Sequence, residues 1–246
     1  SCDTYYYGLA ADIDVDRLHE FLTQFGFGAR SGIDVRGEHR GLLPSRAWKM
    51  KRFRQKWYAG DSISVGIGQG YNLTTPLQLA HATAILANDG VVHRPHLVRE
   101  TVDIVTGERR VIEPEPIRPI RLNPKWVQLV KSAMVDVTRP GGTAARAGAG
   151  AEYTFAGKTG TAQVIAMKQD EKYDEKKVAE RHRDHSLFIS FAPAEAPRIA
   201  LAVLVENGGH GSATAAPIAR VVLDYYLLGR IPERPLPLDP DAPEEG

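Results

Sequence analysis

The stretch Tyr-Thr-Phe-Ala-Gly-Lys-Thr-Gly-Thr-Ala-Gln-Val, from Tyr153 to Val164, sets a lysine among small and β-branched residues. This composition is typical of a β-strand, and we predict one from Phe155 to Ile165. Side chains two residues apart on a strand share a face, so the hydroxyls of Thr159 and Thr161 should reach the same ligand. Gly160 between them carries no side chain that would keep another backbone from docking on the strand edge.

The lysine of this stretch, Lys158, places a positive charge at the surface of the predicted sheet. Such a charge can hold a substrate carboxylate, and it lowers the cost of deprotonating a nearby hydroxyl. The backbone N–H of Thr161 can supply one half of an oxyanion hole. A Lys-Thr-Gly tripeptide alone occurs in many unrelated proteins. Its position on a predicted strand, before a predicted hairpin and a closing helix, is what makes the motif informative.

Two apolar strands and a helix follow the lysine stretch. Leu187–Ala192 and Ile199–Val205 are predicted to form a hairpin through the segment Pro193–Pro197. Between the lysine strand and this hairpin, Lys168–Asp184 is densely charged in both signs, which favours a solvated surface excursion over a lid or docking surface. The closing helix has an apolar stripe that should face the core, made by Ile218, Val221, Val222 and Tyr225.

Upstream of the lysine stretch the sequence predicts mainly helices. Asp14 caps a helix whose apolar residues run to Phe25, Thr75 and Pro76 begin a second helix, and Pro124–Val137 forms a third. The remaining segments are predicted to be a tight glycine-rich turn at Ser64–Gly70, a loop with a short strand at Gly28–Gly41, strands around the turn Thr106-Gly107 within Val91–Ile112, an extended connector at Glu113–Pro124, and a disordered tail at residues 231–246.

Composition limits the class of protein. The 246 residues suit one large domain or two small ones, and 43% hydrophobic residues are enough for a substantial core. Lys and Arg number 31 against 30 Asp and Glu, so the net charge of +1 gives no electrostatic case for nucleic-acid binding. The basic stretch Arg46–Trp57 is interleaved with aromatic residues, and we interpret it as a solvated helix face with apolar Lys and Arg stems.

The sequence shows neither a signal peptide nor a membrane-spanning run, because its longest apolar stretch, Ile199–Val205, has the length of a strand. The chain begins with Ser1-Cys2-Asp3 rather than with methionine, so we expect a processed or truncated product whose anchor lies upstream. The single cysteine, Cys2, excludes an internal disulfide framework.

Four segments together resemble the class B penicillin-binding proteins, and most closely their elongation-specific D,D-transpeptidases of the penicillin-binding protein 2 type. They are Ser1-Cys2-Asp3-Thr4-Tyr5-Tyr6-Tyr7, Gly66-Ile67-Gly68-Gln69-Gly70-Tyr71, Thr75-Pro76-Leu77-Gln78 and Gly157-Lys158-Thr159-Gly160-Thr161-Ala162-Gln163. The similarity runs through nearly the whole chain. The family's S-x-x-K motif, which supplies the nucleophilic serine, is absent, because no serine of this sequence has a lysine three residues later.

The resemblance implies an α+β fold of the penicillin-recognising serine transpeptidase and β-lactamase type, with an antiparallel five-stranded sheet flanked by helices. Residues 1–230 would be the C-terminal portion of a transpeptidase domain whose S-x-x-K segment lies upstream. The implied reaction is acyl transfer from D-Ala-D-Ala stem peptides of peptidoglycan. The upstream serine attacks the peptide carbonyl, D-Ala leaves, and an amine of a second stem peptide resolves the acyl-enzyme.

The resemblance also implies roles for the candidate site residues. Ser1 and Lys158 would relay a proton to the leaving amine, and Thr161 would complete the catalytic set. Asp3 stands where most relatives have asparagine, and it is expected to contact the peptide amide of the substrate. The terminal carboxylate of a stem peptide, or that of a β-lactam, would be bound by Thr159, Gly160 and Thr161.

By the same resemblance the reaction requires no cofactor. A structural zinc could use Cys2 together with ligands outside this chain, although a small residue buried beside the site is the plainer interpretation of Cys2. The expected partners are peptidoglycan stem peptides, β-lactams and membrane proteins of an elongation complex, with no nucleic acid. The expected location is the periplasmic side of the bacterial inner membrane, with the anchor outside this chain.

Other functions remain open at this point. Because the nucleophile is missing, the chain could be a non-catalytic module that binds stem peptides or a partner protein. Ser1 could instead be an N-terminal nucleophile whose own amine is the base, as in autoprocessed hydrolases, and Lys158 would then be coincidental. A β-lactamase would need a base that activates a deacylating water, and the sequence offers no residue that can be identified as one.

Overall fold

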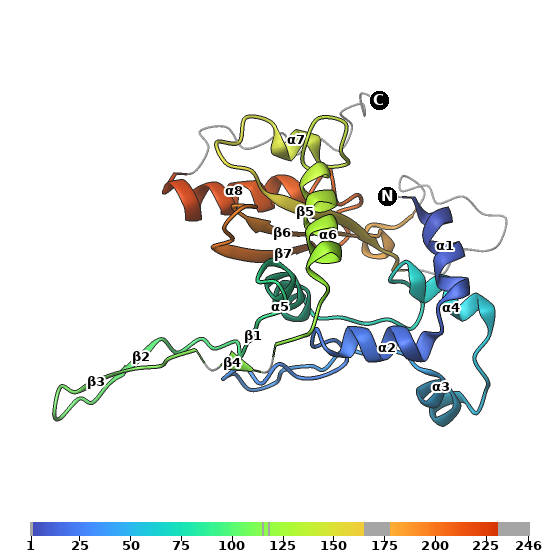
Figure 1. The fold of residues 1–246 in the computed structure, drawn as a ribbon, viewed down its shortest axis with the longest axis horizontal. Helices are drawn as coiled ribbons and strands as arrows, with labels where there is room; N and C mark the ends of the chain where they lie inside the picture. Colours follow the sequence, from blue (N-terminus) through green and yellow to red (C-terminus); the bar gives the residue numbers. More distant parts are fainter. Residues whose placement is uncertain (1, 115, 118, 165–177, 231–246) are drawn as a thin grey trace. The chain divides into compact units, whose positions relative to one another are not determined.

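The computed structural model describes residues 2–114, 116–117, 119–164 and 178–230, and the chain divides into two compact units, Ser1–Leu122 and Asn123–Gly246 (Figure 1). The division falls within the connector predicted at Glu113–Pro124. The predicted tail and most of the charged segment Lys168–Asp184 lie outside the described residues.

Five helices dominate the first unit: α1 (Asp3–Asp12), α2 (Val15–Thr23), α3 (Arg46–Phe53), α4 (Ala59–Gly66) and α5 (Pro76–Ala87). The caps of α2 and α5 confirm the predicted starts. Asp14 accepts a hydrogen bond from the N–H of Asp16 (2.8 Å), and Thr75 forms a capping box with Gln78 before Pro76. Helix α1 was not predicted.

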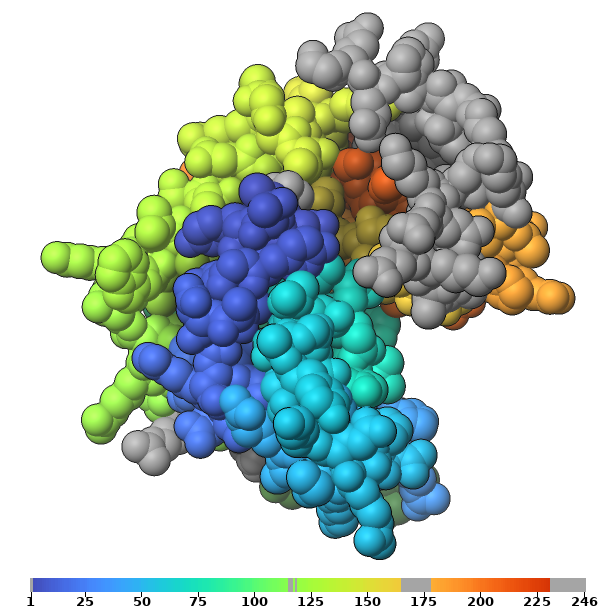
Figure 2. All heavy atoms as spheres, turned by 90° about the vertical axis from the view of Figure 1, so that its right-hand side faces the viewer, coloured from blue at the N-terminus to red at the C-terminus, as the bar shows by residue number. Residues whose placement is uncertain are grey.

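Helices α1 and α4 pack closely, and Figure 2 shows their side chains in direct contact, in dark blue and cyan. Gly66 permits this approach, because a Cβ added there would lie 2.2 Å from the Cβ of Ala10. Helix α4 includes Ser64 and Gly66, so the prediction of a turn over Ser64–Gly70 is wrong in its first half. The helical signal was hidden by the glycines.

Gln78 joins α5 to the loop before α3. Its side-chain amide donates to the carbonyls of Gly26, Ala29 and Arg40 at 2.8–3.3 Å, and the residue is 2% exposed. The short strand predicted within Gly28–Gly41 does not form. These carbonyls are satisfied by one side chain instead of by a neighbouring strand.

The predicted strands around the turn Thr106-Gly107 are confirmed. Strand β2 (Glu100–Val102) pairs antiparallel with β3 (Arg109–Val111). The predicted connector contains a two-residue strand, β4 (Pro116–Ile117), which pairs with β1 (Val92–His93).

The second unit contains α6 (Pro124–Asp136), α7 (Ala145–Gly148), β5 (Ala156–Ala162), the short 3-10 helix η2 (Glu180–His182), β6 (His185–Ala192), β7 (Ile199–Val205) and α8 (Ala215–Leu228). The strands form one antiparallel sheet in the order β5-β6-β7, which confirms the lysine strand and the hairpin. The expected five strands are wrong for the described residues, whose largest sheet has three. No described helix is both long and apolar enough to cross a membrane.

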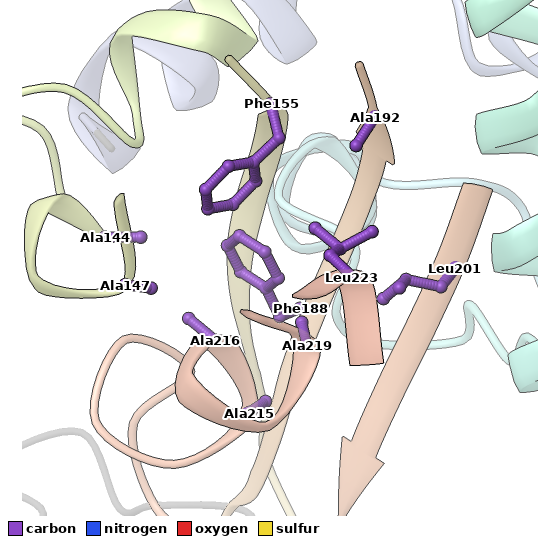
Figure 3. Packing of buried hydrophobic residues seen from close by; sticks show 10 residues of the cluster. All are labelled: Ala144, Ala147, Phe155, Phe188, Ala192, Leu201, Ala215, Ala216, Ala219 and Leu223. Carbon is purple, nitrogen blue, oxygen red and sulfur yellow. The ribbon is translucent and has the colours of Figure 1, made fainter. Parts of the chain in front are cut away.

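The core of this unit lies between the sheet and α8 (Figure 3). Phe188 of β6 is fully buried beneath Ala216, Ala219 and Leu223 of α8. Its ring also lies over Gly157, where an added Cβ would come within 2.3 Å of the ring. Large aromatic side chains therefore fill the space that the alanines and this glycine leave open.

The closing helix was predicted correctly, but its buried face was not. Val222 is 42% and Tyr225 62% exposed, whereas Arg220 and Asp224 are buried. Small alanines form the packed stripe, and the two charged residues are buried because they bond each other and neighbouring backbone. A search for large apolar residues at helical spacing detects neither the alanine stripe nor the buried charged pair.

Two serines of β6 allow a matched test of this core. The hydroxyl of Ser186 donates to the carbonyl of His210 (3.0 Å) and accepts from the N–H of Ala215 (3.1 Å), while the equally buried hydroxyl of Ser190 has no partner among the described residues. Ser186→Ala should lower the free energy of unfolding by about 1–3 kcal/mol, because it leaves buried groups unpaired.

Ser190→Ala should leave the free energy of unfolding unchanged or raise it by up to about 1 kcal/mol, because it removes a hydroxyl that is buried without a bond. Urea titration followed by circular dichroism measures both. Equal losses in the two variants would contradict this account.

Candidate active site

Strand β5 carries the four predicted residues of the lysine motif. Lys158, Thr159, Gly160 and Thr161 are all partly exposed, whereas the strand's first two residues are buried. In the register with β6, Thr159 lies opposite Phe188, and Thr161 lies two positions along on the same face. The structure therefore confirms that the two threonine side chains share a face.

One hydrogen bond shows which backbone N–H and C=O groups of β5 point toward β6 and which point away from it. The carbonyl of Thr154 accepts from the N–H of Ala194, just beyond the end of β6, at 2.8 Å. Backbone groups along a strand point alternately to its two edges. The N–H and C=O groups of Thr159 and Thr161, at odd offsets from Thr154, therefore point to the edge away from β6, where no described strand pairs with β5.

The Lys158 ammonium group donates to the carbonyl of Thr159 at 2.8 Å. Its charge is thereby held beside the outward-pointing backbone of the strand. A half-buried cation next to backbone N–H groups is suited to bind a carboxylate or a developing oxyanion.

A glycine-rich loop that follows β7 packs on the β5–β6 pair. A Cβ added at Gly211 would lie 2.3 Å from the carbonyl oxygen of Leu187 and 2.6 Å from that of Gly160. At Gly160 the nearest atom to an added Cβ is the Cβ of Leu187, at 3.3 Å. The close backbone approach expected at Gly160 is therefore present, but Gly211 is the residue whose missing side chain permits it.

The two glycines should therefore differ in how well they tolerate alanine. Gly211→Ala should lower the free energy of unfolding by about 1–3 kcal/mol, because the new methyl group meets fixed backbone atoms. Gly160→Ala should cost less than about 1 kcal/mol, because its nearest neighbour, the Leu187 Cβ at 3.3 Å, needs to move by only a few tenths of an ångström. Thermal unfolding of both variants measures the difference, and a Gly211→Ala variant no less stable than Gly160→Ala would rule this packing out.

The far end of the hairpin is held by polar contacts. Asp184 is 8% exposed, its carboxylate accepts from the N–H of Val164 (3.4 Å), and its carbonyl accepts from Gly209 (3.0 Å). The adjacent His185 accepts from the N–H of Asn207 through Nδ1 (2.9 Å). These bonds tie Val164 and the glycine-rich loop to the start of β6.

The other predicted site residues lie in the first unit. Asp3 is the first residue of α1 and is exposed, and Cys2 precedes the helix as an exposed free thiol. Ser1 lies outside the described residues. The interpretation of Cys2 as a buried residue is therefore wrong.

A metal site at Cys2 finds no support in the described part of the chain, where no group of three or more His, Cys, Asp or Glu side chains lies together. One exposed cysteine does not supply the four ligands of a structural zinc site. No step of the reaction proposed below runs through a metal.

Sequence reasoning missed Ser186, Gly211 and Asp184. The sequence signal for Gly211 is the glycine-dense run after Glu206. Ser186 and Asp184 carry no local signal, because their partners are 20 or more residues away.

Comparison with known proteins identifies the architecture. A model of the penicillin-binding protein transpeptidase domain matches residues 1–224. The peptidoglycan D,D-transpeptidase MrdA of Escherichia coli (strain K12) is 44% identical over 231 residues, which cover 93% of this chain and 36% of the relative. MrdA of Haemophilus influenzae is 42% identical over 239 residues, which cover 95% and 36%.

Solved structures agree with these relatives. Pseudomonas aeruginosa PBP2, solved in complex with WCK 5153, has a TM-score of 0.76 and 45% identity, over 92% of this chain and 47% of that one. PBP2 of Helicobacter pylori, solved in complex with MreC, has a TM-score of 0.75 and 33% identity, over 92% and 38%. They confirm the predicted fold class. The chain spans 36% of the length of the curated relatives named above, and it belongs to the penicillin-binding protein transpeptidase family.

Proposed function

We propose that this chain supplies the carboxylate-binding and oxyanion wall of a peptidoglycan D,D-transpeptidase. The observation that carries the proposal is strand β5, where Lys158 lies beside two threonines whose backbone groups point away from β6. An extended peptide can add to such an edge through main-chain hydrogen bonds. The D-Ala-D-Ala end of a stem peptide is an extended peptide with a terminal carboxylate, which Lys158, Thr159 and Thr161 would hold.

In the proposed reaction a serine oxygen bonds to the carbonyl carbon of the penultimate D-Ala, and the bond to the terminal D-Ala nitrogen breaks. The serine proton passes to that nitrogen, with Ser1 and Lys158 as the relay. The N–H of Thr161 stabilises the intermediate oxyanion. Asp3 contacts the substrate's peptide amide. The amine of a second stem peptide then attacks the ester, forming the new peptide bond and returning a proton to the serine.

We place the nucleophile outside this sequence, in an upstream S-x-x-K segment of a longer protein. Two observations support this: no serine here has a lysine three residues later, and the chain spans 36% of its curated relatives. Residues 1–230 would then be the C-terminal portion of the transpeptidase domain, with residues 231–246 as a tail. Any zinc at Cys2 would need ligands from that upstream part.

The same reasoning gives a location and partners. The substrate is cell-wall peptidoglycan, so the site faces the periplasm, and the anchor to the inner membrane belongs to the part of the protein outside this chain. A complex with MreC has been solved for the Helicobacter pylori relative. Membrane proteins of the elongation complex are accordingly the proposed protein partners.

Release of D-Ala tests the proposal. The longer protein, incubated with a stem pentapeptide ending in D-Ala-D-Ala, should release D-Ala, and penicillin should block the release. The same peptide ending in L-Ala-L-Ala is the control and should not react. Absence of release would favour the non-catalytic module, and rapid turnover of the penicillin itself would favour a β-lactamase.

A further inference from the structure

One surface of the first unit carries a concentration of positive charge that is not part of the lysine motif on β5. From His39 to Gly60 the chain has seven Lys and Arg residues and no Asp or Glu, although the whole chain carries a net charge of only +1. Figure 2 shows the end of this stretch, in light blue, with side chains that project into solvent. Solubility does not explain why the excess of Lys and Arg over Asp and Glu is confined to this one stretch.

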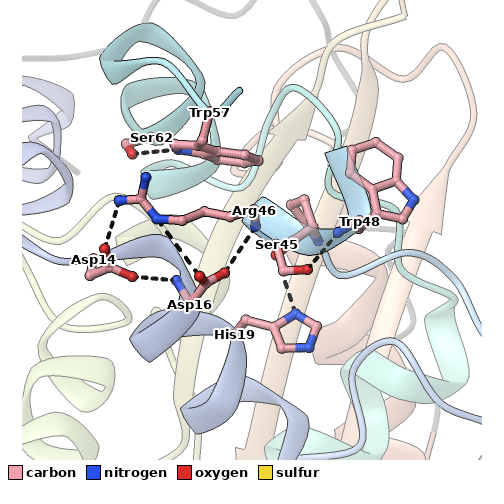
Figure 4. Close-up of polar contacts among 9 residues, drawn as sticks. Asp14, Asp16, His19, Ser45, Arg46, Trp48, Trp57 and Ser62 are labelled. Carbon is pink, nitrogen blue, oxygen red and sulfur yellow. Dashed lines mark hydrogen bonds and ion pairs between the residues drawn. The ribbon is translucent and has the colours of Figure 1, made fainter. Parts of the chain in front are cut away.

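Two of the stretch's cations have structural roles. Arg46 pairs with Asp14 (2.6 Å) and Asp16 (3.7 Å), which joins the start of α3 to the start of α2 (Figure 4). Lys49 is 2% exposed and pairs with Asp61. These charges are internally compensated.

Four others are not compensated. Lys51, Arg52, Arg54 and Lys56 are exposed, and no acidic side chain within the described residues pairs with them. We call these four residues the basic cluster.

A fixed aromatic platform lies among the basic cluster. The Phe53 ring, 44% exposed, lies 5.6 Å from the rings of both Trp48 and Tyr71. The buried ammonium group of Lys49 lies 4.7 Å from the Tyr58 ring and 5.6 Å from the Tyr71 ring. Rings held on several sides in this way present a preformed surface that loses little conformational freedom on binding.

Arg54 of the basic cluster occupies a backbone position that would suit glycine better. It ends α3 with φ 56°, in the left-handed region where glycine is favoured, and its N–H bonds the carbonyl of Met50 (3.0 Å). The other described non-glycine residues with positive φ are Asp89 and Asn207, types that tolerate this conformation. An arginine there sacrifices stability that a glycine would retain.

We propose that the basic cluster and the platform around Phe53 form a binding surface for the glycan strand of peptidoglycan. This inference rests on the proposed function, which makes that polymer the substrate. Stem peptides carry free carboxylates for Lys and Arg, and the apolar faces of amino-sugar rings stack on aromatic rings. The surface would hold the polymer through its stem-peptide carboxylates and its sugar rings.

The geometry favours this ligand over a bilayer or a nucleic acid. The Phe53 and Trp48 rings pack against each other and against Tyr71, so they cannot extend to the depth that an interfacial membrane anchor requires. The net charge of +1 across the chain is unlike that of nucleic-acid-binding domains.

Co-sedimentation of the protein with purified peptidoglycan sacculi at 50 and 200 mM salt tests the inference. Replacing all four residues of the basic cluster by glutamine should weaken binding by about tenfold or more at low salt, and should flatten the salt dependence. A matched control replaces four exposed cations elsewhere, Arg99, Arg110, Lys125 and Arg146, and should bind as the unmodified protein does.

Arg54→Gly separates binding from folding. It should weaken sedimentation while leaving the melting temperature unchanged or higher, because glycine suits the left-handed position. Phe53→Leu, which removes the ring face and keeps an apolar side chain, should also weaken binding.

Three results would overturn the inference: equal sedimentation of the cluster and control variants, binding to vesicles of phosphatidylethanolamine and phosphatidylglycerol but not to sacculi, or binding to a 20-nucleotide DNA but not to sacculi. Sacculus binding is an equilibrium measurement that needs no acylation. If the longer protein binds sacculi but does not react with penicillin, only the proposed reaction is overturned. If it reacts but does not bind sacculi, only this surface is overturned.

Discussion

Replacing Arg220 by alanine should lower the free energy of unfolding by about 3–5 kcal/mol, the cost of leaving one partner of a buried ion pair alone. Arg220 is 8% and Asp224 5% exposed, and the Arg220 Nε donates to an Asp224 carboxylate oxygen at 2.8 Å. The other guanidinium nitrogens donate to the carbonyls of Ala147, Ala149 and Gly150 at 2.9–3.1 Å. Alanine would remove the donor to these three carbonyls and would leave the buried Asp224 carboxylate without its cation, with the Tyr153 hydroxyl as its remaining hydrogen-bond partner among the described residues.

The same network reaches the lysine strand. Tyr153 donates its hydroxyl to the Asp224 carboxylate oxygen at 2.7 Å, three residues before β5 begins. Burial, together with this bond to Asp224, raises the pKa of Tyr153 above its usual range, so the hydroxyl remains a donor. Arg220 therefore fixes the chain that leads into β5 as well as stabilising α8.

Urea titration measures the effect of Arg220→Ala, and a second arginine of the same unit is the control. Arg139 pairs with Asp136 at 3.4 Å, but both side chains are more than 60% exposed. Arg139→Ala should change the free energy of unfolding by less than about 0.5 kcal/mol. A loss below about 1 kcal/mol for Arg220→Ala would show that the buried network does not stabilise the unit.

Lys158→Ala, made in the longer protein, should lower the rate of acylation by penicillin about 10²–10³-fold, the usual cost of removing one group that stabilises developing charge at an acyl-transfer site. The substitution removes the cation held beside the outward-pointing β5 backbone. Stopped-flow mixing with a fluorescent penicillin gives the rate constant.

Lys125→Ala is the matched control, since Lys125 is exposed in the first turn of α6. Its acylation rate should equal that of the unmodified protein. Both lysine variants should unfold within about 1 kcal/mol of the unmodified protein, because neither lysine is fully buried. A Lys158→Ala protein that acylates at the normal rate would remove the lysine from the proposed site.

Local signals predicted most elements of this fold. Asp14 and Thr75 cap helices as their residue types indicate, and the apolar run Leu187–Ala192 forms a strand with the predicted neighbour. The buried side of α8 was wrong because tertiary partners override a hydrophobic pattern. Arg220 is buried by bonds to residues about 70 positions away, which no window of sequence contains.

The candidate site was predictable to a similar extent. The four residues of the lysine motif lie together because they are consecutive on one strand. Their grouping was therefore predictable from the sequence alone. The contacts that hold this strand in place are not local, since Gly211 packs on Gly160 across about 50 residues. The roles of Ser1 and Asp3 come from the resemblance and remain predictions.

Mapping the penicillin adduct in the longer protein tests the central claim most directly. After labelling and proteolysis, mass spectrometry should find the acyl group on a serine of an S-x-x-K segment upstream of Ser1, and on no residue of the 246 in this chain. The labelling should fall sharply in the Lys158→Ala variant. An adduct on Ser1, or strong covalent labelling of this chain by itself, would contradict the claim that these residues form the wall of the site and not its nucleophile.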